Sequence, residues 1–219
     1  MAVVWRSFGL TVFPVSTFIF FWLAKDVYLE EAMDLDLLGE KLVSALDHPA
    51  WLTVMGLITE TGSVWWFALF TLIIAGLLWR LNYSRLDIAC FLLAVGGGGL
   101  LNKSLKLFFQ RERPNLLLQY DGVGYSFPSG HAMGSLIFYG FLAYLVVMSP
   151  FQRWAKFGLG ILLLSLILLI GISRVYLGVH YLTDVIAGYT AGLVWLSCCL
   201  GVLQLKKAQA SSGKRGIVS

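Results

Sequence analysis

Long apolar runs constrain this chain more than any other feature of its sequence. About six segments reach the roughly 18 to 20 apolar residues that a helix needs to cross a bilayer. Lipid leaves no backbone polar group solvated, so such runs fold as helices. The sequence therefore predicts an all-α membrane bundle with short loops, formed as one domain over residues 1–205. The expected spans cover about residues 7–24, 63–79, 87–109, 129–148, 157–173 and 179–205.

The composition agrees with a membrane protein and argues against several other classes. Of the 219 residues, 58% are hydrophobic and 13% are charged, whereas a soluble domain of this length has about 25% charged residues. The net charge of +4 is small and its basic residues are scattered, so nucleic-acid binding is not expected. The three cysteines lie in apolar segments, which argues against a disulfide framework.

Two segments fall outside the expected spans. Residues 25–62 form an acidic outer loop, in which Leu38, Leu42 and Leu46 recur every four residues. This spacing predicts a surface helix with one apolar face. The tail at 206–219 is basic and rich in small residues, so we expect it to be disordered.

Basic residues set the expected orientation in a cell (inner or plasma) membrane. With six spans, Arg6, the turns at 80–86 and 149–156, and the tail all fall on one side, which the positive-inside rule makes cytoplasmic. Both termini are then cytoplasmic. A second group of cations breaks the rule by lying on the outer side, and an anionic ligand there would explain it. This group contains Lys103, Lys106, Arg111, Arg113 and Arg174.

Three short motifs converge at the expected outer ends of the spans. The first is Lys106 followed by six residues and Arg113-Pro114, and the second is Pro128-Ser129-Gly130-His131. The third is Ser173-Arg174, five residues, His180, three residues and Asp184. Because the span count alone places these motifs together, we expect them to form one site.

The cations and small residues of these motifs suit a phosphate group. Arg113 and Arg174 can each donate two parallel hydrogen bonds to phosphate oxygens, and Lys106 adds a point charge. Ser129 and Gly130 fall at the expected start of a helix, where free N–H groups and the positive end of the dipole attract anions. We therefore expect all five to bind phosphate.

The histidines suit nucleophilic and acid–base chemistry on that phosphate. If the chain is helical from about residue 179, His180 and Asp184 share a face, and the carboxylate can orient the imidazole. His180 is then the candidate nucleophile, and His131 is the candidate general acid that later activates water. The same spacing continues to Gly188 and Gly192, which predicts a close helix contact.

Other interpretations of these residues are weaker. His131, His180 and Asp184 could bind a metal, but the surrounding cations oppose this. Simple ion pairing, such as Arg174 with Asp184 or Lys106 with Glu112, would explain single residues but not three spaced motifs. The run Gly96–Gly99 predicts close packing of a neighbouring helix, with a hinge as the alternative.

The three motifs together resemble the signature motifs of the type-2 phosphatidic acid phosphatase superfamily of membrane lipid phosphatases. Every signature position matches, and the chain is most similar to small bacterial phosphatidylglycerophosphate and undecaprenyl pyrophosphate phosphatases. The resemblance implies hydrolysis through a phosphohistidine on His180, without metal or cofactor, on the extracytoplasmic side. The matching positions are Lys106, Arg113, Pro114, Pro128, Ser129, Gly130, His131, Ser173, Arg174, His180 and Asp184.

The sequence leaves some alternatives open. The same site could pass a phosphoryl group to an acceptor other than water, as in a lipid-linked phosphotransferase. A lipid transporter or flippase is less favoured, because the charges lie at span ends rather than at their centres. Phosphatidylglycerophosphate, undecaprenyl pyrophosphate and phosphatidic acid all fit as substrates, and the oligomeric state is not determined.

Overall fold

The computed structural model describes residues 2–31, 34–44, 49–114 and 124–215. Within these ranges every regular element is an α-helix, which confirms the predicted all-α class. The helices are α1 (Ala2–Tyr28), α2 (Asp34–Ser44), α3 (Pro49–Glu60), α4 (Val64–Arg80), α5 (Arg85–Phe109), α6 (Gly130–Met148), α7 (Arg153–Tyr176) and α8 (Leu182–Arg215).

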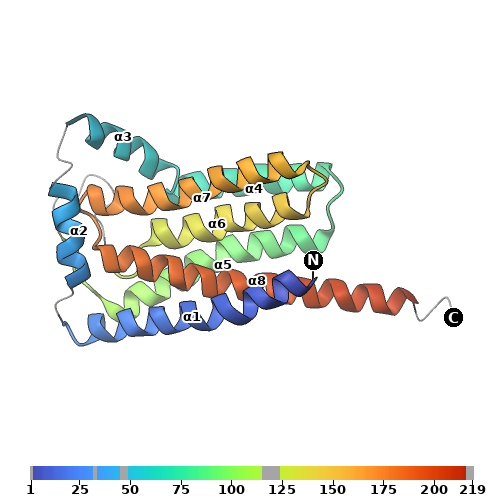
Figure 1. The fold of residues 1–219 in the computed structure, drawn as a ribbon, viewed down its shortest axis with the longest axis horizontal. Coiled ribbons are helices and arrows are strands. Elements are labelled where there is room, and N and C mark those ends of the chain that lie inside the picture. The colour runs from blue at the N-terminus through green and yellow to red at the C-terminus, as the bar shows by residue number, and fades with distance from the viewer. Residues whose placement is uncertain (1, 32–33, 45–48, 115–123, 216–219) are drawn as a thin grey trace.

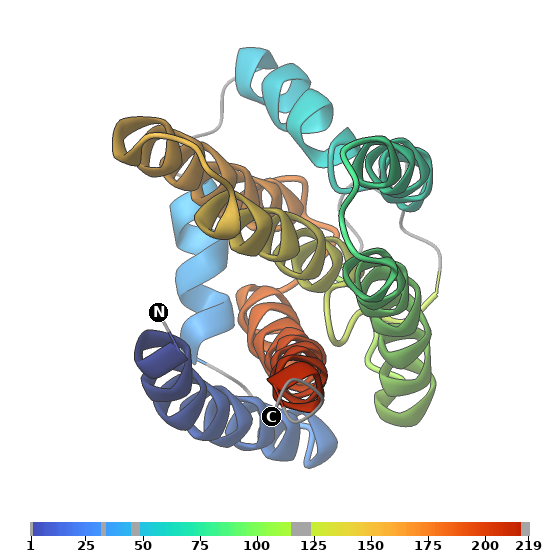
Figure 2. The same ribbon diagram turned by 90° about the vertical axis from the view of Figure 1, so that its right-hand side faces the viewer.

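The helices that match the expected spans, α1 and α4 to α8, run along the long axis of the molecule (Figure 1). Helix α6 is central and packs against α5, α7 and α8, and α1 packs along α8 (Figure 2). The short helix α2 crosses one end of this bundle, and α3 lies at the same end. The polar motifs therefore meet at the end that α2 covers.

Four described helices, α5 to α8, are long and apolar enough to cross a membrane. Helices α3 and α4 make a fifth candidate if they count as one span bent by 44°. By this criterion the described residues support four or five spans rather than six. The expected first span forms the 27-residue helix α1, which lies outside that count. The protein is thus a multi-pass membrane protein.

Helix α8 extends further than the sequence predicted. It continues to Arg215, so the expectation of a disordered tail is wrong for residues 206–215, while 216–219 lie outside the described residues. An ion pair of 2.5 Å joins Lys207 to Asp87 of α5. The Ala, Gln and Lys residues after 205 also favour a helix, so it persists beyond the apolar run.

Helix α2 forms where a surface helix was predicted. Leu38, on the expected apolar face, is 47% exposed, whereas Asp36 is only 8% exposed. Asp36 faces inward because it bonds Thr183 of α8 and Arg111. The side chain of Leu42 and all of Leu46 and His48 lie outside the described part.

Glycines control how closely the central helices approach. A Cβ at Gly188 would lie 2.7 Å from the Ser129 carbonyl oxygen, and one at Gly192 would lie 3.1 Å from that of Met133. The predicted close contact is therefore present, between α8 and α6.

The glycine run on α5 has two kinds of position. Gly97 and Gly98 receive the side chains of Trp195 and Ile137, which confirms the predicted packing. Gly96 and Gly99 have no atom within 4 Å of an added Cβ, apart from their own local backbone. Helix α5 remains continuous through the run.

Gly188→Ala is expected to destabilise the protein. The added methyl would press on backbone of the α6 start, and overpacking of this kind costs about 1–3 kcal/mol. Gly201→Ala on the same helix is the matched control, since nothing lies within 4 Å of its added Cβ. Thermal unfolding in detergent should show a lower midpoint for Gly188→Ala alone, and equal midpoints would contradict this packing.

Candidate active site

The three motifs come together at one end of the bundle, where α5 and α7 end and α6 and α8 begin (Figure 1). A cavity of about 650 Å³ opens there. Its wall includes side chains or backbone of each motif, namely Lys106, Arg113, Gly130, His131 and His180. The predicted convergence is therefore present in the structure.

His180 and Asp184 form a buried pair. The Nδ1 atom of His180 lies 3.3 Å from Oδ2 of Asp184, and the Tyr181 amide donates to the same oxygen at 2.9 Å. The expectation that His180 is helical is wrong, because α8 begins at Leu182. Gly178, at φ 64°, allows the preceding turn. From the first turn of α8, Asp184 still reaches back to the imidazole.

Ser126 completes this pair, and the sequence analysis did not identify it. Its hydroxyl oxygen lies 3.2 Å from His180 Nδ1 and donates to Asp184 Oδ2. Ser126 is fully buried. No sequence spacing links it to either partner, because it lies in an irregular connection 54 and 58 residues away from them.

The other ring nitrogen of His180 faces a cation. Arg113 Nη1 lies 3.4 Å from Nε2, and a guanidinium can only donate, so Nε2 is the acceptor and Nδ1 carries the proton. Carbonyl oxygens of Gly124 and Val179 hold Arg113 at 2.9 and 3.0 Å. This arrangement places the lone pair of Nε2, which here accepts from Arg113, at the cavity wall.

Burial lowers the pKa of His180 well below its ordinary value, and the charges of Lys106 and Arg174 add to this effect. The hydrogen bond and the charge of Asp184 act in the opposite direction but do not compensate. The imidazole is therefore neutral near pH 7, which is the form that can attack an electrophile.

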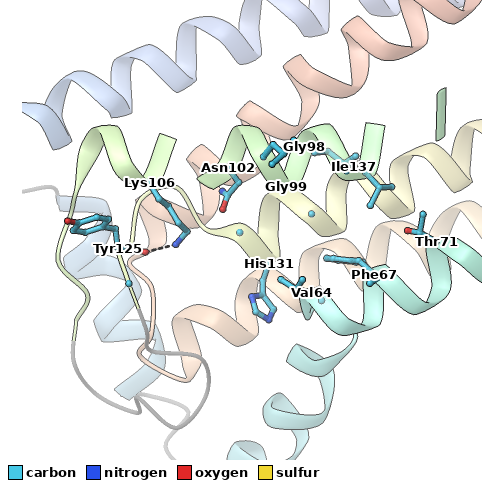
Figure 3. Close-up of a pocket in the computed structure, with 18 of the residues that line it drawn as sticks. Val64, Phe67, Thr71, Gly98, Gly99, Asn102, Lys106, Tyr125, His131 and Ile137 are labelled. Atoms are coloured by element: carbon cyan, nitrogen blue, oxygen red, sulfur yellow. Dashed lines mark hydrogen bonds between the residues drawn. The ribbon is translucent and has the colours of Figure 1, made fainter. Parts of the chain in front are cut away.

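Lys106 and Gly130 form one side of the cavity. Lys106 Nζ donates to the carbonyl oxygen of Tyr125 (Figure 3) and also to that of Ser126. One turn earlier on α5, the Asn102 amide nitrogen donates to the Pro128 carbonyl oxygen at 3.2 Å. A Cβ at residue 130 would lie 2.9 Å from Asn102 Oδ1. Only glycine therefore fits without a shift at this position.

Ser129 and Arg174, which the sequence predicts to bind phosphate, are fully buried and do not line the cavity. Ser129 caps α6, and its own amide donates to the Asp184 carbonyl oxygen at 3.0 Å. Arg174 is fully buried and donates to Thr59 Oγ1 at 2.8 Å. Phosphate binding by these two residues therefore stays a prediction.

Asp184 pairs with a different arginine from the one weighed in the sequence analysis. Its Oδ1 accepts a hydrogen bond of 2.6 Å from Arg111, not from Arg174. Burial acts to lower the pKa of Arg111, but Asp184 and Asp36 outweigh it and raise that pKa. Among the described residues, no group of three or more His, Cys, Asp or Glu side chains is placed to hold a metal ion.

The cavity continues away from the polar residues into an apolar part between α4, α5 and α6 (Figure 3). Phe67, Leu72, Leu100 and Ile137 line this part, and Gly96 and Gly99 leave room in its wall. A cationic end joined to an apolar end suits an amphiphile whose head group is an anion.

Lys106→Met is expected to weaken the binding of inorganic phosphate about tenfold, because a charge-assisted contact is lost. Lys103→Met is the matched control, since Lys103 is exposed on the same helix and does not line the cavity. Titration calorimetry in detergent measures both affinities, and an equal loss in the two variants would refute the assignment.

Comparisons with known proteins agree on one family. A sequence profile described as the PAP2 superfamily matches residues 87–207. Phosphatidylglycerophosphatase B of Bacillus subtilis (strain 168) is 37% identical over 186 residues, which cover 83% of this chain and 90% of that protein. An undecaprenyl-diphosphatase of Sulfolobus acidocaldarius is 39% identical over 89 residues, or 41% of this chain and 38% of that protein.

A solved structure is similar as well. It is the crystal structure of a transmembrane PAP2-type phosphatidylglycerolphosphate phosphatase from Bacillus subtilis, with a TM-score of 0.77 and 32% sequence identity. The match covers 87% of this chain and 95% of that one.

Proposed function

Because this chain belongs to the PAP2 superfamily and is a membrane lipid phosphatase, we propose that it acts through a phosphohistidine on His180. One observation carries this proposal. Asp184 and Ser126 hold Nδ1 of His180, while Nε2 lies 3.4 Å from Arg113 at a cavity that His131 also lines.

In the first step, Nε2 of His180 forms a bond to phosphorus, and the bond from phosphorus to the leaving oxygen breaks. The negative charge of the bound phosphate favours the protonated form of His131, which gives its proton to that oxygen. Lys106 and Arg113 neutralise charge on the remaining phosphoryl oxygens. Asp184 stabilises the positive charge that develops on the imidazole, because it accepts a hydrogen bond from the Nδ1–H group.

In the second step, neutral His131 takes a proton from a water molecule, which attacks phosphorus. The bond between phosphorus and Nε2 breaks, inorganic phosphate leaves, and His180 returns to its neutral form. The scheme uses neither a metal ion nor a cofactor. With an acceptor other than water, the same steps would make a phosphotransferase.

The substrate that we propose is a lipid phosphomonoester or diphosphate, with its tail in the apolar part of the cavity. Phosphatidylglycerophosphate is the first candidate, because a relative that matches 83% of this chain is a phosphatidylglycerophosphatase. Undecaprenyl pyrophosphate and phosphatidic acid are the next candidates, since both join a phosphate to a long tail.

We propose that the site faces the extracytoplasmic side and that both termini are cytoplasmic. The basic turns after α4 and α6, and the basic end of α8, lie at the end of the bundle opposite the site (Figure 1). The positive-inside rule assigns that end to the cytoplasm. The charged turns and the site would then lie on opposite surfaces of the membrane.

Rapid-quench labelling tests the intermediate. Wild-type protein given a lipid with radioactive phosphate should carry acid-labile label on His180 and release phosphate without an added acceptor. His180→Ala should lose both signals, and His131→Ala should slow release about 10²–10⁴-fold.

His48→Ala is the matched control for these histidine variants and should behave as wild type. Excess chelator should also leave the rate unchanged. The mechanism is wrong if His180→Ala still releases phosphate at the wild-type rate, or if only a divalent metal restores activity. Release that requires an added alcohol would indicate the phosphotransferase instead.

Gly96→Leu is expected to discriminate between long and short lipids. No atom lies within 4 Å of a Cβ added at this position, so a leucine can be accommodated. Its side chain would occupy the apolar part of the cavity, so the KM for a long-chain lipid phosphate should rise roughly tenfold. The KM for a short-chain analogue should change little. Gly160→Leu on α7 is the control, because a Cβ added there has no atom within 4 Å and Gly160 does not line the cavity. Equal KM changes for both lipids would exclude this tail position.

A further inference from the structure

Asp36 differs from the acidic residues beside it on α2. It is 8% exposed, whereas Asp34 and Glu40 on the same helix are exposed to solvent. A carboxylate is costly to bury unless it is paired and hydrogen-bonded. The partners of Asp36 therefore indicate what this helix does.

Both oxygens of Asp36 are engaged at the start of α8. Oδ1 accepts from the backbone amide of Thr183 at 3.0 Å and from its hydroxyl at 2.8 Å. Oδ2 accepts from Arg111 at 2.6 Å. The Thr183 amide belongs to the first turn of α8 and has no partner within the helix. Asp36 thus caps α8 from a position 147 residues away in the chain.

Arg111 joins Asp36 to the carboxylate beside His180. Its Nη2 contacts Asp36, and its Nη1 contacts Asp184 Oδ1, each at 2.6 Å. The guanidinium also lies over the Tyr181 ring, 4.1 Å from the ring centroid. A planar guanidinium that is held by three contacts keeps the groups that it bonds in fixed positions.

We propose that Asp36 is a positioning residue for the nucleophile and makes α2 a working part of the active site. Through Arg111 and Thr183 it fixes Asp184, and Asp184 in turn orients His180. This inference rests on the roles proposed above for His180 and Asp184. Asp36 acts through these residues, since it does not line the cavity.

The charge of Asp36 matters as well as its shape. Without it, Asp184 would be the one carboxylate that Arg111 pairs with, beside the Thr183 hydroxyl. Asp184 would then be a weaker acceptor for the Nδ1 proton of His180. It would then stabilise less of the positive charge that forms on the ring when phosphorus is attacked. Since substrate contacts are unchanged, kcat should fall while KM stays nearly constant.

Asp36→Asn tests this link with little change of shape. Asparagine can still cap α8, but the ion pair with Arg111 is lost. We expect kcat for phosphate release to fall about tenfold, with KM within about twofold. Asp34→Asn and Glu40→Gln are the matched controls on α2 and should keep wild-type values. Arg111→Lys removes the guanidinium that bonds both Asp36 and Asp184, and it should lower kcat at least as much.

A double-mutant cycle separates positioning from general stability. If Asp36 acts through Asp184, then Asp36→Asn should slow Asp184→Asn no further. Independent, multiplicative losses would overturn the proposal. So would a normal kcat per folded molecule together with a lower thermal midpoint in detergent.

The same assay distinguishes failure of the proposed function from failure of the positioning role. Wild-type protein that releases no lipid phosphate would contradict that function, and this inference with it. Wild-type release that is lost in His180→Ala, combined with a normal kcat for Asp36→Asn and Arg111→Lys, would contradict the positioning role alone.

Discussion

A fully buried carboxylate, Asp184, is the constraint on which the rest of the site depends. Removing a charge from water costs several kcal/mol unless partners replace the solvent. The partners here come from separate parts of the chain. They are Arg111 after α5, Ser126 before α6, and His180 and Tyr181 before α8. Satisfying this one carboxylate therefore brings the helix ends together and orients the imidazole.

The packing of the bundle and the geometry of the site are linked at the start of α6. Gly188 lets α8 approach the Ser129 carbonyl, and the Ser129 amide donates to the Asp184 carbonyl oxygen. The same turn carries Gly130 and His131 into the cavity wall. A change in helix separation here would move the His131 and His180 imidazoles relative to each other. This explains why small residues lie where the two helices cross.

The sequence predicted the parts that depend on residue type and spacing, and it missed those that depend on tertiary contacts. Apolar runs and the three motifs were enough to predict the helical class. They also predicted that Lys106, Arg113, His131 and His180 lie around one site. Ser126 could not be found, because an irregular loop has no periodicity. The inward position of Asp36 on α2 could not be predicted, because local leucine spacing cannot reveal a partner such as Thr183, which lies far along the chain.

The central claim is that His131 and His180 act on one phosphorus atom, and orthovanadate tests it most directly because it mimics the transition state of phosphoryl transfer. An experimental structure with orthovanadate should show vanadium bonded to Nε2 of His180, with the His131 ring beside the opposite apical oxygen. Lys106 and Arg113 should donate to its equatorial oxygens. Vanadate bound away from His180, or the two rings contacting separate anions, would contradict the account.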